Sequence, residues 1–245
     1  MNLLSIPILK RLYPSIVRRY LMLIGDFKHN IKISNFIFEI DIRESIERKT
    51  YFINEYEKKR VDYLIKESEE INSKILIDVG ANIGFYSILL SNSFEQIYSF
   101  EPNKRNFQIL EKNLKINNLK KIKIFNFGLG EKKQLLKGHS NTKGKLIQTS
   151  GFAVSEKIHE GEEVLIQSGD KILQFKNKII TIKIDVEGFE LFVLRGIKNI
   201  LRNNHCLLQI EIWEKNNDDV HGFLELFNYK EINKIDGDTF FSNKI

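Results

Sequence analysis

The chain has 245 residues, 42% of them apolar, and its 38 basic and 32 acidic residues give a formal net charge of +6. This composition is ordinary for a globular protein and provides enough apolar residues for a sizeable core. The single cysteine, Cys206, excludes an intramolecular disulfide and a zinc site built from cysteines, which favours a cytoplasmic protein. The sequence also lacks an apolar run of the roughly 18–20 residues that cross a bilayer.

Positive charge is concentrated near the N-terminus, because four of the six net charges lie in residues 1–30. A basic arm of this kind can bind nucleic acid or lie on anionic lipid. The simpler interpretation is a helix, broken at Pro14, that packs on the domain with its Lys and Arg side chains in water. We favour this packed helix and keep a peripheral membrane contact as the alternative.

Two short period-two runs follow in residues 31–42 and are separated by Ser34-Asn35, which predicts a β-hairpin. A helix is expected around residues 55–70. From Lys74 onward, apolar runs alternate with amphipathic stretches, which indicates βαβ units and a parallel sheet. The expected strands are 75–79, 97–100 and 122–127, and the expected helices are 84–92 and 103–117.

The regular pattern lapses over residues 131–178, which we interpret as an insertion able to border a substrate pocket. Regular alternation then resumes. Asp236-Gly237-Asp238 separates the last two apolar runs, and this sequence is typical of a hairpin turn. The expected strands are 179–184, 207–212, 229–235 and 239–245, and the expected helices are 190–202 and 219–227.

These elements predict one main α/β domain over residues 73–245, with a mostly parallel sheet that ends in an antiparallel hairpin. Residues 1–72 are expected to form an extension of a helical arm, a hairpin and a helix that packs on this domain.

The strongest local signal is Asp78-Val79-Gly80-Ala81-Asn82-Ile83-Gly84, a glycine loop between an expected strand and a helix. Ligands of open parallel sheets bind at such strand ends. The dinucleotide fingerprint Gly-x-Gly-x-x-Gly requires glycine where Asn82 stands, so the loop argues against NAD. A ligand with one carboxylate and one ammonium group, such as the methionine half of S-adenosylmethionine, needs only the Gly80 turn and Gly84 packing, with Asp78 near the ammonium.

The next expected strand ends in Glu101-Pro102. A carboxylate at this point can accept hydrogen bonds from both ribose hydroxyls, and Pro102 begins the following helix at a position that needs no N–H. The alternative role for Glu101 is that of a solvated acid favoured by the helix dipole. A ribose-binding acid serves NAD and S-adenosylmethionine alike, so its combination with the Asn82 loop discriminates between them and favours S-adenosylmethionine.

A third signal follows the strand expected at 179–184 and reads Asp185-Val186-Glu187-Gly188-Phe189-Glu190. Asp185 and Glu187 are two residues apart, so both project toward the site if the strand persists. Asp185 is our first candidate for the base that removes the proton of a hydroxyl acceptor. Glu187 and Glu211 are further catalytic candidates, whereas Glu190 is more simply explained as an acid in the first turn of a helix.

Other reactive side chains give weaker signals. The carboxylates of Asp185, Glu187 and Glu211 suit Mg²⁺, but their spacing is not diagnostic, and we predict no metal site. His139, within the insertion, is a weak further candidate. Cys206 is most simply a small apolar residue of a buried strand.

Taken together, the motifs resemble the FkbM family of methyltransferases, and the resemblance runs from about residue 36 to residue 213. It implies a Rossmann-like class I methyltransferase fold, S-adenosylmethionine as the methyl donor, and O-methylation of a hydroxyl on a sugar, glycan or secondary metabolite. It also implies that Gly80, Asn82 and Gly84 hold the methionine portion, that Glu101 holds the ribose, and that Asp185, Glu187 and Glu190 match the family's acidic motif.

One segment departs from the family pattern. The family leads us to expect a small Gly/Ser-rich loop at residues 141–145, where this chain has Lys143 and Lys145. Two lysines there suit an acceptor with an anionic sugar or a phosphate.

Two alternatives from other functional classes stay open. A nucleic-acid methyltransferase would use the basic arm, but base-methylating enzymes usually place Asn/Asp-Pro-Pro-aromatic where this chain has residues 185–188. Carboxylates there repel phosphate backbones, so we expect no nucleic-acid partner. A non-catalytic protein that kept the fold is the second alternative, because fold alone does not imply function.

Overall fold

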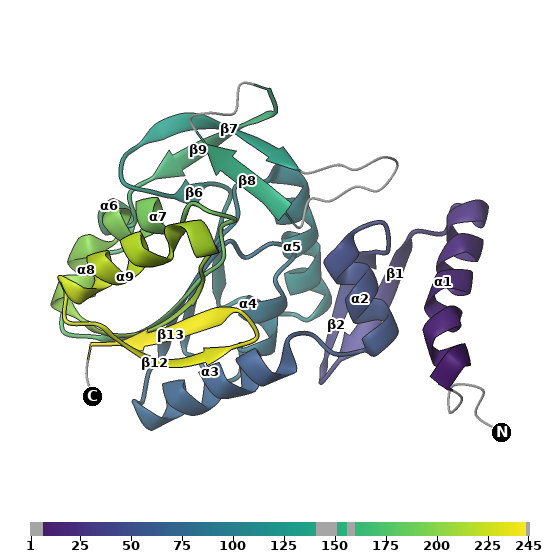
Figure 1. Ribbon diagram of the computed structural model, residues 1–245, viewed down its shortest axis with the longest axis horizontal. Coiled ribbons are helices and arrows are strands. Elements are labelled where there is room, and N and C mark those ends of the chain that lie inside the picture. Colours follow the sequence, from purple (N-terminus) through teal and green to yellow (C-terminus); the bar gives the residue numbers. More distant parts are fainter. Residues whose placement is uncertain (1–6, 141–150, 156–159, 244–245) are drawn as a thin grey trace.

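A seven-stranded sheet forms the centre of the computed structural model, which describes residues 7–140, 151–155 and 160–243 (Figure 1). Five neighbouring strands run parallel, and the last two form an antiparallel hairpin at one edge. This confirms the predicted Rossmann-like α/β arrangement. In sheet order the strands are β12 (Lys230–Ile235), β13 (Asp238–Ser242), β11 (His205–Glu211), β10 (Ile179–Ile184), β3 (Ile75–Val79), β4 (Gln96–Phe100) and β5 (Ile122–Phe125).

Helices cover both faces of the sheet, and each face has its own apolar core. Because alternate strand residues point to opposite faces, Ile75 and Ile77 of β3 belong to one core and Leu76 to the other. The first core is closed by α7 (Glu190–Gly196), α8 (Lys198–Asn203) and α9 (Asn217–Glu225), and the second by α3 (Lys58–Glu70), α4 (Phe85–Leu89) and α5 (Lys104–Ile116).

The single helix expected over 190–202 is wrong, because the chain breaks into α7 and α8 at Ile197. At this point the backbone of Gly196 approaches that of Gly130 so closely that a Cβ on Gly196 would lie 1.9 Å from the carbonyl oxygen of Gly130. The bend between the two helices accompanies this close approach to the segment that leads into the insertion.

The hairpin predicted over 31–42 is confirmed and packs against α5. The side-chain oxygen of Asn113 accepts a hydrogen bond from the Glu39 N–H at 2.7 Å, and that of Asn117 accepts one from the Ile37 N–H at 2.8 Å. The N-terminal segment shares the second core with the main sheet, and the division at residue 72 stays a prediction. Its elements are α1 (Pro7–Ile24), β1 (Lys28–Ile33), β2 (Phe36–Asp41) and α2 (Ser45–Ile53).

Two helices of this segment differ from the prediction. α1 runs through Pro14 without ending, so the expected break there is wrong; a proline removes one N–H donor, and the helix continues to the buried Leu21. The helix expected around 55–70 begins at Lys58, and α2 precedes it as a separate helix that periodicity did not indicate. No helix in the described part of the chain is long and apolar enough to cross a membrane.

The insertion and the preceding strand β6 form a small second sheet, which the sequence pattern did not reveal. Its strands lie above the main sheet in Figure 1, and the last of them is followed by the short helix α6. The sheet order is β6 (Gly128–Leu129), β9 (Glu162–Gln167), β7 (Gln134–Ser140) and β8 (Phe152–Ser155), and α6 spans Gly169–Ile172.

Glu47 of α2 makes stability depend on pH. Its side chain is 3% exposed, its carboxylate accepts a hydrogen bond from the Asp41 N–H, and burial raises its pKa from the ordinary value of 4.5 to about 8. The contribution of Glu47 to the free energy of unfolding is therefore fully present below about pH 4.5 and is lost as the pH rises through about 8. Glu47→Gln, which keeps the acceptor oxygen, should raise the melting temperature at pH 8.5 by at least about 2–4 °C, the effect of about 1 kcal/mol in a chain of this size.

The same substitution should have little effect at pH 5, where Glu47 is protonated in the folded protein. Thermal unfolding followed by circular dichroism at both pH values measures the difference. Glu69→Gln, at an exposed position of α3, is the matched control. An equal change in melting temperature at pH 5 and pH 8.5 would contradict the assignment.

Candidate active site

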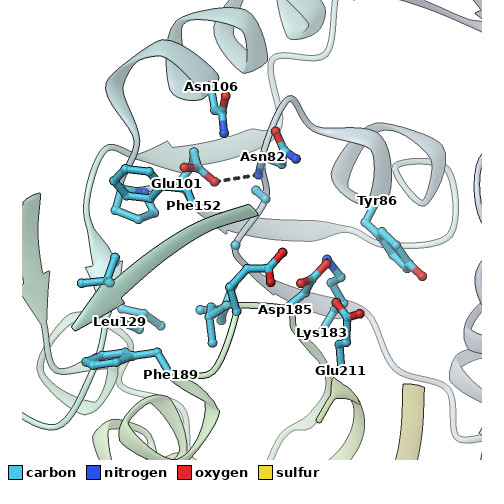
Figure 2. Close-up of a pocket in the computed structure, with 18 of the residues that line it drawn as sticks. Asn82, Tyr86, Glu101, Asn106, Leu129, Phe152, Lys183, Asp185, Phe189 and Glu211 are labelled. Carbon is cyan, nitrogen blue, oxygen red and sulfur yellow. Dashed lines mark hydrogen bonds and ion pairs between the residues drawn. The ribbon is translucent and has the colours of Figure 1, made fainter. Parts of the chain in front are cut away.

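A pocket lies at the carboxyl ends of β3, β4, β10 and β11 (Figure 2). Gly80, Glu101 and Asp185 directly follow three of these strands, and Glu211 ends the fourth; all four line the pocket. The empty space at this site, including its open mouth, is about 1030 Å³. The topology therefore brings the three sequence motifs together in one place, as the strand ends of an open parallel sheet allow.

The glycine loop after β3 is held by main-chain contacts. The N–H groups of Gly80 and Ala81 both donate to the carbonyl of Phe100, at 2.9 and 3.0 Å. Gly80 has φ +83°, and a Cβ there would lie 1.9 Å from the carbonyl oxygen of Asp185, so only glycine fits. Asn82 also has positive φ, at 51°. The loop therefore lies directly against the turn that carries Asp185.

Glu101 is fixed between the loop and the following helix. One carboxylate oxygen accepts the N–H of Asn82 and the other accepts that of Asn103, both at 2.8 Å. The side chain is buried, and this burial raises the pKa of Glu101 to about 7. Each oxygen keeps a further lone pair, so Glu101, which lines the pocket, can still accept hydrogen bonds from a ligand.

Two predicted binding residues lie behind the pocket wall. Asp78 is fully buried and is absent from the described lining; its Oδ2 accepts a 2.5 Å hydrogen bond from Ser87, and its Oδ1 has no hydrogen-bond partner among the described residues. Gly84 is the N-cap residue directly before α4, and a Cβ there would lie 2.4 Å from the Leu110 side chain. Gly84 therefore serves helix packing, whereas Gly80 and Asn82 line the pocket.

The acidic motif reaches the pocket through a turn. We predicted that Asp185 and Glu187 would share one side of a persisting strand, but β10 ends at Ile184 and Glu187 has a left-handed backbone with φ 53°. Both side chains nevertheless line the pocket. Glu190 does not; it is buried and accepts the Gly188 N–H at 2.6 Å, which stabilises the turn.

A lysine and two carboxyl groups form the polar end of the pocket. The buried Nζ of Lys183 lies 3.0 Å from Asp185 Oδ2 and 4.6 Å from the centre of the Tyr86 ring. Burial opposes ionisation of Asp185, but Lys183 and a hydrogen bond from Glu211 outweigh it and lower the pKa of Asp185. The charge of Asp185 and then burial raise the pKa of Glu211 to about 9. At neutral pH Asp185 is therefore ionised and Glu211 carries a proton.

A hydrogen-bonded network supports this end of the pocket. Tyr86 donates to Glu57 at 3.0 Å, and Gln209 donates to Tyr86 and to Asp238, each at 2.6 Å. Arg60 closes the network by pairing with Glu57 at 2.6 Å and with Asp238 at 2.5 Å. The network therefore joins three parts of the chain beside the polar end: the segment between α2 and α3, the core strand β11, and the C-terminal hairpin.

The opposite end of the pocket is apolar. Figure 2 shows Phe152, Leu129 and Phe189 on the side of Glu101 that faces away from Lys183 and Glu211. Phe152 belongs to β8, so the insertion does border the pocket, as expected. The sequence did not indicate that Phe152 is the residue of the insertion that reaches the pocket, because only the pairing of β8 with β7 brings it there. Glu57 was also missed, since nothing in its local sequence indicates a pocket.

The weaker candidates lie elsewhere. His139 is an exposed residue of β7 and is absent from the described pocket lining. Cys206 is fully buried in β11, as predicted for a small apolar residue. Lys143 and Lys145 lie outside the described residues. Within those residues, no three His, Cys, Asp or Glu side chains are grouped to hold a metal ion.

Comparison with protein families supplies the decisive observation. The family model described as "Methyltransferase FkbM domain" matches residues 78–231, from the glycine loop to β12. The chain belongs to the FkbM methyltransferase family. The match includes Glu101 and the acidic turn at Asp185, which confirms the family that the motifs indicated.

Several known proteins are similar to this FkbM-family chain. Hexuronic acid methyltransferase AglP of Haloferax volcanii is 30% identical over 155 residues, which cover 60% of this chain, and Methyltransferase 1 of Beauveria bassiana is 23% identical over 147 residues, which cover 51%. The chain matches 59% of the length of each of these relatives. The crystal structure of a methyltransferase FkbM from Methylobacillus flagellatus aligns with a TM-score of 0.48 and 20% identity, over 69% of this chain and 43% of that one.

S-adenosylmethionine is the usual methyl donor of the family, and the pocket fits it. Gly80 and Asn82, in a loop that admits no Cβ at residue 80, would hold the methionine portion. Glu101 would accept the ribose hydroxyls, and the apolar end with Phe152 and Leu129 suits the adenine. Asp78 is absent from the described pocket lining, so its predicted contact with the ammonium group stays a prediction.

Proposed function

We propose that this FkbM-family protein transfers a methyl group from S-adenosylmethionine to a hydroxyl oxygen of a sugar, glycan or secondary-metabolite acceptor. One observation carries the proposal: Asp185, held beside Lys183, lines the same pocket as the donor loop and Glu101. A hydroxyl acceptor must lose its proton during the transfer, and an ionised carboxylate beside the donor can take it. The ionised Asp185 in this pocket therefore supports O-methylation as the reaction.

Each polar side chain has a separate part in the proposed reaction. When bound, S-adenosylmethionine supplies a methyl group whose bond to a positively charged sulfur breaks as the acceptor oxygen bonds to the carbon. Asp185 accepts the hydroxyl proton, and Lys183 keeps Asp185 ionised beforehand. Glu211 shares its proton with Asp185 and so fixes the orientation of the base. Glu187 also lines the pocket, which supports a part for it in binding a further acceptor hydroxyl.

Similarity to known proteins supports a sugar-like acceptor. The relative AglP is named for methylation of a hexuronic acid, a sugar with several hydroxyl groups and one carboxylate. The pocket lining includes the carboxyl groups of Glu57, Glu187 and Glu211. They suit a ligand rich in hydroxyl groups, because carboxyl groups accept hydrogen bonds from hydroxyls. A carbohydrate hydroxyl is therefore the first acceptor to test.

Two measurements test the proposal. Calorimetric titration with S-adenosylhomocysteine and, separately, with NAD should give saturable binding of the first alone. Incubation with methyl-labelled S-adenosylmethionine and a panel of neutral sugars, uronic acids, glycans and secondary metabolites should then place the label on an oxygen, identified by mass spectrometry. Binding of NAD alone or of neither ligand would overturn the donor assignment. Transfer to RNA or DNA, with salt-dependent binding, would instead support the nucleic-acid alternative.

Lys183 should act on the reaction through the ionisation of Asp185. Lys183→Met removes the positive charge that lowers the pKa of Asp185, so the acidic limb of the pH–rate profile should move to higher pH. A rise of one pH unit lowers the rate on that limb about tenfold. Lys183→Arg keeps the charge and should keep the limb closer to wild type. An unmoved limb in Lys183→Met, with normal S-adenosylhomocysteine affinity, would show that Lys183 only supports the fold.

A further inference from the structure

α1 presents apolar side chains on two sides. Leu21 is 8% exposed and packs into the second core, whereas Ile16, Tyr20 and Leu23 are 62%, 60% and 85% exposed. With the exposed Arg19, these three residues have the spacing i, i+3, i+4 and i+7, which places them on one face of the helix. α1 is also the outermost element on its side of the molecule in Figure 1, far from the C-terminal hairpin. Its outward face therefore combines large apolar side chains with a cation.

A positively charged hollow lies between α1 and α2. It is lined by Arg18, Arg48 and Lys49 together with Ser15, Ser45, Phe52 and Ile53, and no acidic residue is among these described lining residues. Arg48 is held in place by donating from Nη1 to the carbonyls of Ile42 and Arg43, at 2.9 and 3.1 Å. Burial and then the charge of Arg18 lower the pKa of Arg48. The cations repel each other, so an anion in the hollow would stabilise them.

We propose that α1 and α2 dock on a membrane surface that contains anionic phospholipids. The docking surface consists of the outward face of α1 (Ile16, Arg19, Tyr20, Leu23) and the hollow with Arg18 and Lys49. Exposed Leu, Ile and Tyr enter the headgroup and acyl boundary, and neighbouring cations attract the lipid phosphates; these are the two contributions that bind interfacial helices. Two of the cations concentrated in residues 1–30, Arg18 and Arg19, belong to this surface.

Charge complementarity selects this partner over a second copy of the chain. A two-fold contact through α1 would bring Arg19 of one copy toward the same face of the other, and each hollow would add its own cations. An anionic lipid surface neutralises all of them. The Asp26 carboxylate, just beyond the end of α1, is the acid closest in sequence to this helix.

Sedimentation with vesicles tests the proposal on the full chain. The protein should bind vesicles of equal parts phosphatidylglycerol and phosphatidylcholine, should not bind vesicles of phosphatidylcholine alone, and should be released by high salt. Arg18→Gln with Lys49→Gln should weaken partitioning by about 10- to 30-fold, the effect of two charges at about 1 kcal/mol each. Leu23→Ser should weaken it several-fold without removing a charge.

Matched control variants, together with the molar mass from light scattering, distinguish membrane docking from self-association. Leu226→Ser removes a leucine that is 77% exposed on the far side of the molecule, and Lys59→Gln with Lys230→Gln removes two exposed charges outside the docking surface. Both should bind vesicles like wild type, and every variant should bind S-adenosylhomocysteine normally, as a check on folding. Absent vesicle binding, or equal loss in the control variants, would overturn the proposal. A dimer in light scattering that Leu23→Ser dissociates, without vesicle binding, would overturn it in favour of self-association.

Discussion

Asp185→Asn should lower the turnover of methyl transfer by about 100- to 10,000-fold, the range that a positioned general base contributes. The amide keeps the size of the side chain but cannot accept the hydroxyl proton. Donor binding should be nearly unchanged, because Gly80, Asn82 and Glu101 are untouched. Initial rates with labelled S-adenosylmethionine and the acceptor found in the panel measure the first effect, and calorimetry with S-adenosylhomocysteine measures the second.

Glu211 determines how much activity remains in this variant. Its pKa of about 9 is caused first by the charge of Asp185, so in Asp185→Asn that pKa falls and Glu211 ionises more readily. Glu211 then becomes a substitute base. The double variant Asp185→Asn with Glu211→Gln should be slower than either single variant. If turnover survives Asp185→Asn unchanged, Asp185 is not the base and catalysis rests on positioning alone.

Glu101→Ala should weaken S-adenosylhomocysteine binding about 100-fold or more, because two hydrogen bonds to a charged group contribute roughly 1.5–3 kcal/mol each. The substitution also leaves the N–H groups of Asn82 and Asn103 without their acceptor, which loosens the donor loop. Calorimetric titration measures the affinity, and thermal unfolding checks that the variant is folded. Glu95→Ala, on the exposed start of the β4 segment, is the control that should bind normally.

The same carboxylate should make donor affinity depend on pH. The ribose hydroxyls donate to Glu101, so they prefer its ionised form, and its pKa is about 7. Wild-type affinity for S-adenosylhomocysteine should therefore rise as the pH increases from 6 to 8.5. Glu101→Gln cannot ionise and should lose this rise. A rise of equal size in Glu101→Gln would show that another group is responsible.

The sequence was sufficient for those parts of the fold that depend on local patterning. β3, β4, β10 and β11 are mostly apolar and are largely buried on both faces of the sheet, and such runs are visible without knowledge of their neighbours. The motif residues follow these strands directly. Their convergence could therefore be predicted, because the carboxyl ends of parallel strands lie along one edge.

Features that depend on distant contacts were missed. α2 buries Glu47 and Thr50 rather than an apolar stripe, so its helix has no clear periodic signal. Phe152 reaches the pocket only through the pairing of β8 with β7. The predicted orientation of the Glu187 side chain depended on an extended strand, but Glu187 has a positive φ. In each case the feature is determined by a residue far away in the sequence or by the backbone conformation. Residue types alone report neither.

The contact between Gly80 and Asp185 has a consequence for how such an enzyme can change. The Asp185 N–H also donates to the Val79 carbonyl at 3.0 Å, so the glycine loop and the turn that carries Asp185 are joined through the main chain. Their spacing does not depend on the side chains that surround the acceptor. Side chains that face the acceptor can therefore be exchanged during evolution while the distance between the glycine loop and Asp185 is preserved.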